Sequence, residues 1–378
     1  MRIGIICEYN PFHNGHIYHI EKIKEKYPDS TIILVMSSFF TERGDISVLD
    51  KKAKTEIALE NNVDLVIELP FVFATQSADI FAYGAISILN KLDVDLLIFG
   101  SESDNIEALK ETALTELEDD NYDNVVKDFL DEGVNYPTAL SKALDMITGY
   151  KVTKPNDLLG ISYIKALILT NSKIEPETIK RTNDYHDLKV DTISSASAIR
   201  KALSSKSDIS GAVPAITKNY IRFIDENMYF KLLKLKVIAD IDDLDIYQTV
   251  DEGIENRVKK FIYKSKSLEE LILNIKTKRY TYNKIRRMLT HILCSFKKED
   301  AKNLEIEYLR ILGFNKKGQK VLNEVKKDLD VPIYFNYKEK LNKYLDLDFK
   351  VATIYAEIVG DSSIIDDEFK IFPIKKWY

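Results

Sequence analysis

Short apolar runs alternate with amphipathic stretches along the first half of the chain. Apolar runs at 3–7, 31–36, 64–69 and 94–99 predict buried strands, and a fifth strand is expected around 178–181. Near-continuous apolar strands separated by helical patterns are typical of a parallel sheet that is covered on both faces. The pattern therefore predicts an α/β fold built on a doubly wound, five-stranded parallel sheet.

The second half of the chain has a different rhythm. A charged helical insertion at 106–150 already interrupts the alternation, and residues 217–378 show helical periodicity with few strand candidates. Ser, Gly and Pro cluster at 206–214, which favours a domain boundary there. We therefore expect a catalytic domain over residues 1–208 and a mainly helical domain over residues 209–378.

The composition is that of an ordinary globular protein. The 378 residues are 45% hydrophobic and 30% charged, and this length suits two domains. No apolar run reaches the length of a membrane span, and a strand follows Met1 almost at once, so we expect a cytoplasmic protein. Cys7 and Cys294 lie far apart and form no metal-binding spacing. We expect Cys7 to be a small buried residue of the first strand.

Charge is distributed unevenly along the chain. Residues 257–298 contain 13 Lys and Arg against two acids, Glu269 and Glu270, in a protein of net charge -6. The remainder therefore carries about -17 by subtraction. A basic segment on an acidic protein suggests a polyanionic partner. A solvated helical face is an equally good interpretation of the charge alone.

The segment from Asn10 to His16 reads Asn-Pro-Phe-His-Asn-Gly-His and joins the first strand to the first helix. In open α/β sheets, ligands bind beyond the carboxyl ends of the strands, and a helix start presents free N–H groups to an anion. Gly15 lets a ligand approach the backbone because it has no Cβ. We predict that His13 and His16 donate hydrogen bonds to bound phosphates; the alternative is a turn with two surface histidines.

Three further stretches fall at predicted strand ends beside this corner. Gly100 closes the fourth strand and would let a base or ribose approach the backbone. Asn156 starts a helix, where it would contact a nucleotide or simply cap the helix. Ser195 and Ser197 offer hydroxyls at another helix start, and Arg200 adds positive charge one turn later. The ordinary alternatives are a turn glycine and plain helix caps.

Together these groups suit transfer at an α-phosphate, which needs positioning and neutralisation of charge more than a covalent protein group. The side chains available for this are His13, His16, Arg181, Ser195, Ser197 and Arg200. Paired catalytic carboxylates, a Ser-His-Asp or Cys-His signature and the Walker-A spacing are all absent from the sequence. No acidic cluster indicates a metal held by the protein, and Mg²⁺ bound to the phosphates of a nucleotide is chemically reasonable.

Five motifs occur in a characteristic order: Glu8 to His16, Val66 to Pro70, Phe99 to Glu102, Leu159 to Tyr163 and Lys276 to Thr281. With them, the chain resembles the bacterial tRNA(Met) cytidine acetate ligases, within the HxGH nucleotidyltransferase superfamily. The resemblance implies a nucleotidyltransferase-like fold and a two-step reaction. Acetate attacks the α-phosphate of ATP to give acetyl-adenylate and pyrophosphate, and the acetyl group then passes to N4 of the wobble cytidine of elongator tRNA(Met), forming N4-acetylcytidine.

The resemblance also implies the ATP-binding residues. They are Cys7, Glu8, Tyr9, Asn10, Pro11, Phe12, His13, Asn14, Gly15, His16, Ile20, Gly100, Asn156 and Arg181. The chain departs from the family after the second strand. The family reads Met-Ser-Gly-Asn-Phe and Arg-Gly-Glu-Pro there, whereas residues 36–40 are Met-Ser-Ser-Phe-Phe and residues 43–46 are Arg-Gly-Asp-Ile. This difference leaves the activity level and the selectivity for the acyl group open.

The basic segment supplies the candidate RNA surface. A helix is expected after Tyr282, with Ile285, Leu289, Ile292 and Phe296 on one inward face. Basic residues interleaved with tyrosines suit phosphate contact and base stacking. The candidates are Lys276, Lys278, Arg279, Tyr280, Lys284, Arg286 and Arg287. Tyrosines half-buried at a helix start are the alternative. A small-molecule nucleotidyltransferase and a non-catalytic RNA-binding protein are the competing functions.

Overall fold

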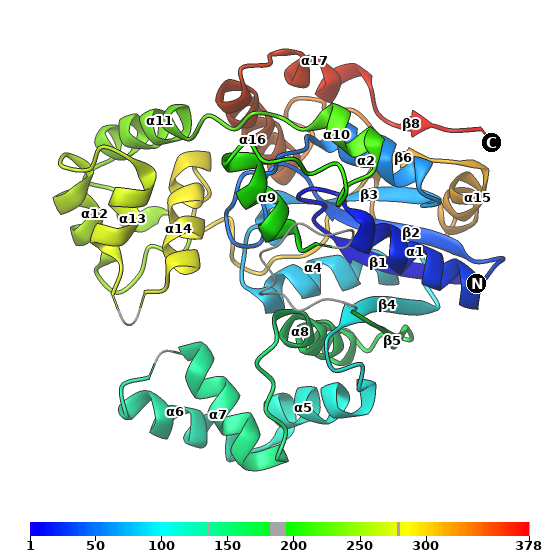
Figure 1. Cartoon of the computed structure of the whole chain (residues 1–378), viewed down its shortest axis with the longest axis horizontal. Helices are drawn as coiled ribbons and strands as arrows, with labels where there is room; N and C mark the ends of the chain where they lie inside the picture. Colours follow the sequence, from blue (N-terminus) through cyan, green and yellow to red (C-terminus); the bar gives the residue numbers. More distant parts are fainter. Residues whose placement is uncertain (135, 182–193, 278–279, 378) are drawn as a thin grey trace.

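The computed structural model describes residues 1–134, 136–181, 194–277 and 280–377. Within these residues an eight-stranded sheet forms the centre of the molecule (Figure 1). Its strands are β1 (Arg2–Cys7), β2 (Thr31–Ser37), β3 (Leu65–Leu69), β4 (Leu96–Ser101), β5 (Glu175–Lys180), β6 (Leu309–Phe314), β7 (Ile333–Tyr334) and β8 (Ile374–Lys375). The order is β5-β4-β1-β2-β3-β6-β7, and β8 pairs with β6.

The first five strands form the predicted doubly wound parallel sheet. β1 lies between β4 and β2 and runs parallel to both, and β3 and β5 continue the parallel pairing outward. The strand order reverses at β1, so the gap between the carboxyl ends of β1 and β4 is the topological switch point. Ligands of open α/β sheets bind in such a crevice.

The predicted strand count is wrong. The C-terminal half adds β6, which runs antiparallel to β3, and β7 and β8, which both pair with β6. β6 was missed because Arg310 and Gly313 interrupt its apolar run, which then resembles one face of a helix. Residues 309–314 therefore belong to the same sheet as the N-terminal strands, and the C-terminal half is not entirely helical.

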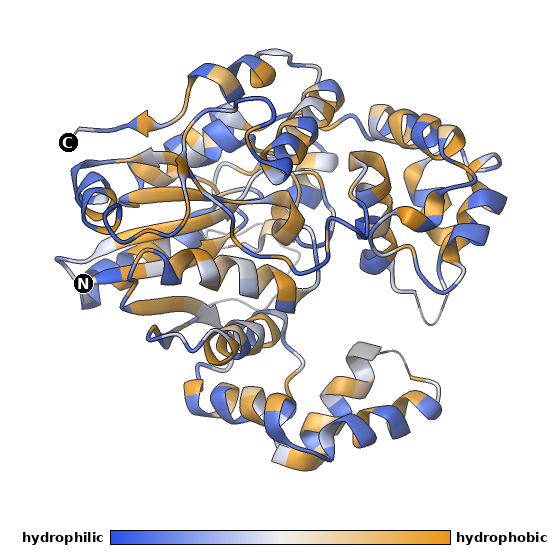
Figure 2. Cartoon of the chain, turned by 180° about the vertical axis from the view of Figure 1, so that it is seen from behind, coloured by the Kyte–Doolittle hydropathy of each residue, from blue (hydrophilic) through white to orange (hydrophobic). Residues whose placement is uncertain are grey.

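Helices cover both faces of this sheet. Those of the N-terminal half are α1 (Asn14–Lys26), α2 (Lys51–Glu60), α3 (Phe71–Ala74), α4 (Ala78–Asn90), α8 (Pro155–Leu169) and α9 (Ala196–Ser204). Alternate residues of β2 enter different cores: Ile33 and Val35 pack into one cluster, and Ile32 and Leu34 pack into the other with α1 and α2. Figure 2 shows the strands as a largely hydrophobic centre. Burial on both faces explains the unbroken apolar runs in the sequence.

The predicted insertion is helical. It contains α5 (Ile106–Glu118), α6 (Tyr122–Asp131) and α7 (Tyr136–Thr148), and it projects from the sheet as an arm (Figure 1). α6 and α7 pack on each other around a small core of their own, which includes Val126 and Leu144. The arm is thus a separate helical unit attached beside α8.

The remaining helices belong to the second half of the chain. They are α10 (Ala215–Tyr220), α11 (Glu226–Ala239), α12 (Ile254–Ile262), α13 (Leu268–Ile275), α14 (Tyr282–Cys294), α15 (Lys316–Val325), α16 (Lys343–Val359) and α17 (Ser363–Lys370), with a 3-10 turn at Leu244–Ile246. α11 to α14 gather to one side of the sheet (Figure 1). Their apolar faces join the same core cluster as the sheet. No helix in the described ranges is long and apolar enough to cross a membrane.

Candidate active site

The corner between β1 and α1 is built around two stacked histidines. His13 is the N-cap of α1, and its Nδ1 accepts a hydrogen bond from Gly15 N–H at 3.0 Å. His16 Nδ1 accepts from His13 N–H at 3.1 Å, and the two rings stack with their centroids 3.9 Å apart. A neutral imidazole that accepts at Nδ1 carries its proton on Nε2. The backbone therefore selects the tautomer in which both Nε2 atoms are donors.

Both histidines are held in the neutral form. Burial, the largest cause, and the positive charges of Arg181 and Arg200 together lower the pKa of His13 to about 3. Burial and the neighbouring His13 hold the pKa of His16 well below its usual range. His13 is buried and His16 half-buried, so the alternative of two surface histidines is wrong. The pair consists of neutral donors rather than acids or bases at neutral pH.

Gly100 and Arg181 form the facing wall at the end of β4. A Cβ on Gly100 would lie 3.3 Å from Cγ of Arg181, so the arginine stem runs across the glycine. Arg181 N–H donates to Ser101 O at 2.9 Å, which ties β5 to β4 at this point. The buried Nε of Arg181 has no hydrogen-bond partner among the described residues. The wall therefore offers a half-buried cation whose buried Nε–H is unused among the described residues.

Asn156 stands beside this wall but does not cap its helix. The N-cap of α8 is Lys154, whose side chain makes no capping bond. Glu102, which follows β4, takes that role: its carboxylate accepts from Asn156 Nδ2 at 2.6 Å and from Asp157 N–H at 3.1 Å. Asp157 in turn accepts from Ser103 N–H at 3.1 Å. The sequence did not predict these reciprocal hydrogen bonds, because the bonded residues lie 54 and 55 positions apart in the chain.

The serine-rich start of α9 reaches the histidine corner through Arg200. Ser195 Oγ caps the helix by accepting from Ala198 N–H at 3.2 Å, and Ser197 Oγ lies 3.0 Å from Ser195 Oγ. Arg200 Nη1 donates to the carbonyl oxygen of Asn10 at 2.7 Å. The predicted anion cradle and the histidine corner are thus in direct contact. The cap on Ser195 is present, and anion binding by this serine stays a prediction.

Comparison with known proteins agrees with this arrangement. The HIGH Nucleotidyl Transferase family model matches residues 1–367. The tRNA(Met) cytidine acetate ligase of Caldicellulosiruptor bescii is 39% identical over 396 residues, which cover 99% of this chain and 98% of the relative. The enzyme of the same name from Bacillus subtilis is 37% identical, with 94% of this chain and 91% of the relative covered. The chain belongs to the tRNA(Met) cytidine acetate ligase family.

Two solved structures of Thermotoga maritima TmcAL share the fold. The apo form I superposes with a TM-score of 0.90 at 32% identity, and the form bound with alpha-thio ATP superposes with a TM-score of 0.88 at 31% identity. Each comparison covers 100% of both chains. The relative therefore holds an ATP analogue on a fold that this chain reproduces along its whole length.

Several residues that the resemblance assigns to ATP binding hold the loop between β1 and α1 in place. Tyr9 and Phe12 are buried in the core under α1, together with Ile20. Asn10 Oδ1 accepts from Val48 N–H at 2.9 Å, and Asn14 Nδ2 donates to Gly211 O at 3.0 Å. These side chains position the loop, and Pro11 follows a cis peptide bond within it.

Cys7 is half-buried rather than buried, because β1 ends there and the chain turns away. This corrects the expectation from the sequence. Burial of the sulfur atom still raises the pKa of its thiol to about 12. The thiol therefore stays protonated at neutral pH and is a poor nucleophile.

The family departure after β2 lies in a tight loop, residues 38–47. Its two sides pair at Phe40 and Ile46. Phe39 stands where the family has asparagine and is buried in the core, as is Phe40, which matches the family. The Phe39 ring packs 4.7 Å from Tyr355 of α16. Gly44 takes a left-handed φ of +78 and lies so close to α14 that a Cβ would be 2.7 Å from Arg287 Cα. The departure is therefore accommodated by packing against helices of the C-terminal half.

Glu8 connects the histidine corner to loop 38–47. Its Oε1 accepts from Glu42 N–H at 2.6 Å, and burial raises the pKa of the carboxyl to about 7. Lys54 of α2 holds the start of the same loop by donating to the carbonyl oxygens of Ser37 and Ser38 at 3.0 and 2.6 Å. Burial lowers the pKa of Lys54 to about 7. The sequence marked Glu8 only through the family motif and did not indicate Lys54.

The candidate RNA residues divide into two groups. Arg286 pairs with Asp45 at 2.7 Å, and Arg287 pairs with Glu42 at 2.6 Å, so these two guanidinium groups hold loop 38–47. Tyr280 is buried, and its hydroxyl donates to Asp251 O at 2.8 Å. Base stacking by Tyr280 is therefore not supported. The helical pattern placed Arg286 and Arg287 outside the apolar stripe of α14, but loop 38–47 packs on that face of the helix.

The other candidates lie nearer to solvent. Lys276 is exposed, and Lys284 is half-buried with its Nζ 4.7 Å above the Tyr280 ring. Lys278 and Arg279 lie outside the described residues. Of the predicted RNA-binding residues that the structure describes, Lys276 and Lys284 thus remain available for a nucleic-acid surface.

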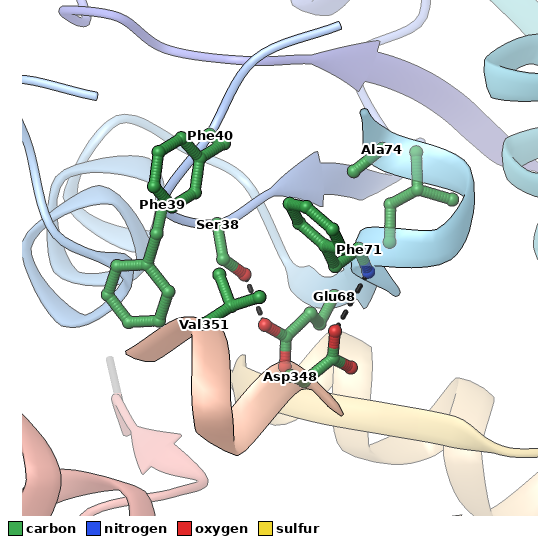
Figure 3. Close-up of a pocket in the computed structure, with 9 residues that line it drawn as sticks. Ser38, Phe39, Phe40, Glu68, Phe71, Ala74, Asp348 and Val351 are labelled. Carbon is green, nitrogen blue, oxygen red and sulfur yellow. Dashed lines mark hydrogen bonds between the residues drawn. The ribbon is translucent and has the colours of Figure 1, made fainter. Parts of the chain in front are cut away.

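A small cavity lies behind loop 38–47 and is too small to hold a nucleotide. Its volume of about 10 Å³ suits a single water, and Figure 3 shows Glu68 and Asp348 pointing into it. Ser38 donates to Glu68, and Asp348 accepts from Phe71 N–H and from Tyr308 OH, each at 2.8 Å. Burial raises the pKa of Asp348 to about 7.

Glu68 is also the centre of a buried ionic cluster that joins the two halves of the chain. Lys51 lies 3.0 Å from Glu68 and 2.7 Å from Glu368 of α17. Arg310 of β6 bridges the same two carboxylates at 3.2 and 2.6 Å. Among the described residues, no group of three or more His, Cys, Asp or Glu side chains could hold a metal ion.

Proposed function

We propose that this protein activates acetate with ATP and transfers the acetyl group to a tRNA. Acetate attacks the α-phosphate of ATP to give acetyl-adenylate and pyrophosphate. The acetyl group then passes to N4 of the wobble cytidine of elongator tRNA(Met), in the cytoplasm. The names of the relatives and the ATP analogue on the Thermotoga maritima protein support this assignment.

The observation that carries the proposal is the neutral histidine pair at the switch point. Two Nε2–H donors, fixed by backbone hydrogen bonds, lie where the phosphates of ATP would reach a helix start. Arg181 and Arg200 lower the pKa of His13 through their charges and so face the same corner. Preorganised donors and cations stabilise the charge that develops on phosphate oxygens during adenylyl transfer.

Mg²⁺ enters this proposal as a companion of ATP. Mg²⁺ keeps several waters and binds through substrate phosphates with few protein ligands. The ion would supply further charge neutralisation, and the chain's own contribution remains the positioning of ATP by the histidines and arginines.

The tRNA surface is proposed on the helical lobe of α12 to α14, within residues 209–378. Lys276 and Lys284 would contact phosphates, together with Lys278 and Arg279. Arg286 and Arg287 would act differently, by holding loop 38–47 against α14. The acidic charge of the rest of the chain would keep the polyanion on this lobe.

Acetate-dependent exchange of labelled pyrophosphate into ATP tests the first step, and mass spectrometry of tRNA nucleosides after incubation with labelled acetate tests the second. We expect exchange without tRNA and labelled N4-acetylcytidine with it. Transfer of AMP to a phosphorylated metabolite, with no acetate dependence, would favour a small-molecule nucleotidyltransferase. Absence of ATP binding in calorimetry would favour a non-catalytic RNA-binding protein.

A further inference from the structure

The second half-reaction must dispose of a proton. N4 of cytidine attacks the carbonyl carbon of acetyl-adenylate, so a C–N bond forms and the C–O bond to the phosphate breaks. AMP leaves with the electron pair of that bond on its phosphate oxygen. The attacking amine carries one proton too many and must lose it. This inference rests on the proposed function and asks which group accepts that proton.

The histidines are unsuited to accept it. The Nδ1 lone pair of each ring is already occupied, in His13 by Gly15 N–H at 3.0 Å and in His16 by His13 N–H at 3.1 Å. Their Nε2 atoms carry the ring protons in this arrangement. Protonation would therefore require the loss of a capping hydrogen bond in a buried place beside two arginines.

The other carboxylates around the corner are committed to partners. Glu42 pairs with Arg287 at 2.6 Å, and Asp45 pairs with Arg286 at 2.7 Å. The Glu102 carboxylate accepts a hydrogen bond from Asp157 N–H at the start of α8, and the Asp157 carboxylate accepts one from Glu102 N–H after β4. Each of these carboxylates is therefore already engaged by a guanidinium group or by several N–H donors.

Glu8 differs from all of them. It lies at the carboxyl end of β1, directly before the histidine corner, and it is half-buried. Among the described residues its carboxylate accepts one hydrogen bond, from Glu42 N–H at 2.6 Å to Oε1, and forms no ion pair within 4.0 Å. Arg287 in turn holds the Glu42 side chain, so α14 fixes the position of Glu8 through the loop.

We propose that the Glu8 carboxylate is the general base that takes the proton from N4 of cytidine during acetyl transfer. The groups that act on Glu8 from the surrounding elements are Cys7 of β1, Glu42 and Arg43 of loop 38–47, Lys54 of α2 and Tyr163 of α8. Burial is the largest effect and raises the pKa of Glu8 to about 7, with Glu42 acting in the same direction and Lys54 and Arg43 against it. A base with a pKa near the working pH is the most effective one.

The test separates the two half-reactions in Glu8→Gln. Acetyl-adenylate prepared separately is mixed with enzyme and tRNA, and the single-turnover rate of N4-acetylcytidine formation is followed from pH 5.5 to 8.5. We expect the wild-type rate to rise with pH through about 7 and then level off, because Glu8 must be ionised. Glu8→Gln should lower the rate by about 100-fold or more and remove this pH dependence. Glu8→Asp should keep the pH dependence at an intermediate rate.

Acetate-dependent pyrophosphate exchange is measured on the same variants, and Glu21→Gln on the exposed face of α1 is the matched control. We expect exchange to fall much less than transfer in Glu8→Gln, and both to be unaltered in Glu21→Gln. Equal losses in both half-reactions would make Glu8 an ATP-positioning residue and overturn the proposal, as would a wild-type transfer rate in Glu8→Gln. Absence of exchange in the wild type would instead refute the proposed function.

Discussion

At the scale of single residues, the site depends on how backbone groups tune side chains. The N–H groups at the start of α1 set the tautomer of His13 and His16. Burial and nearby arginines keep both rings neutral. A neutral donor binds phosphate without the cost of burying a further charge, and its orientation is fixed before ATP arrives.

Replacing His16 by Ala removes one donor from the corner. We expect acetate-dependent pyrophosphate exchange to slow by about 10²–10³-fold, the usual loss for one preorganised donor. The fold should persist, as measured by circular dichroism, because His16 is half-buried and forms one capping bond. Exchange at the wild-type rate would show that the histidine corner does not bind the reacting phosphates.

His291 of α14 provides a test of linkage between pH and stability. It is buried, its Nε2 lies 2.5 Å from Thr75 O, and burial lowers the pKa of its ring to about 4. The unfolded chain protonates this histidine near pH 6.5, whereas the folded chain does so only near pH 4. The contribution of His291 to the free energy of unfolding is therefore present above pH 6.5 and is lost as the pH falls toward 4.

His291→Gln should therefore reduce the acid sensitivity of folding. Between pH 6.5 and 5 the wild type should lose on the order of 2 kcal/mol more unfolding free energy than the variant. Urea unfolding of both proteins at the two pH values measures this difference. Parallel losses in the two proteins would show that His291 already protonates normally in the folded state.

At the scale of elements, the C-terminal half completes the N-terminal sheet. β6 lies against β3, and Arg310 near its start reaches Glu68 and Glu368 in the buried ionic cluster. Loop 38–47 is held in a similar way by α14, through Arg286 and Arg287. Elements distant in the sequence therefore set the geometry of the carboxyl end of β2 and β3.

Arg310→Leu should destabilise the protein strongly. The side chain is fully buried, and its loss leaves Glu68 and Glu368 with only Lys51 to balance them. Removing one partner of a buried ionic group costs about 3–5 kcal/mol. Chemical denaturation measures the loss, and Lys320→Ala at an exposed position of α15 is the control, expected within about 0.5 kcal/mol of the wild type. A similar small effect of Arg310→Leu would mean that the cluster relaxes without it.

At the scale of the whole molecule, charge is divided between a basic lobe and an acidic remainder. The lobe of α12 to α14 and the acidic arm of α5 to α7 lie at different places around the sheet (Figure 1). A polyanion such as tRNA would be attracted to the lobe and repelled elsewhere.

Binding of tRNA should accordingly weaken as salt increases, with a linear plot of log affinity against log salt concentration. Lys276→Ala should reduce the slope by about 1, because it removes one phosphate contact. Lys127→Ala on exposed α6 is the matched control and should leave the slope unchanged. Filter binding over a series of salt concentrations measures both, and equal slopes in all three proteins would place the tRNA elsewhere.

Local patterns in the sequence were sufficient for most of the sheet and for the histidine corner. Five parallel strands, the helical insertion and the strand-to-helix turn at His13 follow from apolar periodicity and from turn residues that are adjacent in the chain. Gly100, Arg181 and Arg200 could be placed near the corner because parallel strands bring their carboxyl ends to one edge. These inferences need only neighbours in sequence and the rule of sheet topology.

Tertiary structure alone decided the features that depend on a partner from far along the chain. From the sequence, Arg310 resembles a polar residue of a helix. In the fold it lies in strand β6 and pairs with Glu68 and Glu368. The sequence alone predicted Arg286 and Arg287 to be part of an RNA surface, but in the fold they pair with Asp45 and Glu42. The raised pKa of Glu8 likewise comes from burial in the folded protein. A charged side chain is exposed or buried according to whether it finds a partner, and the partner is chosen by the fold.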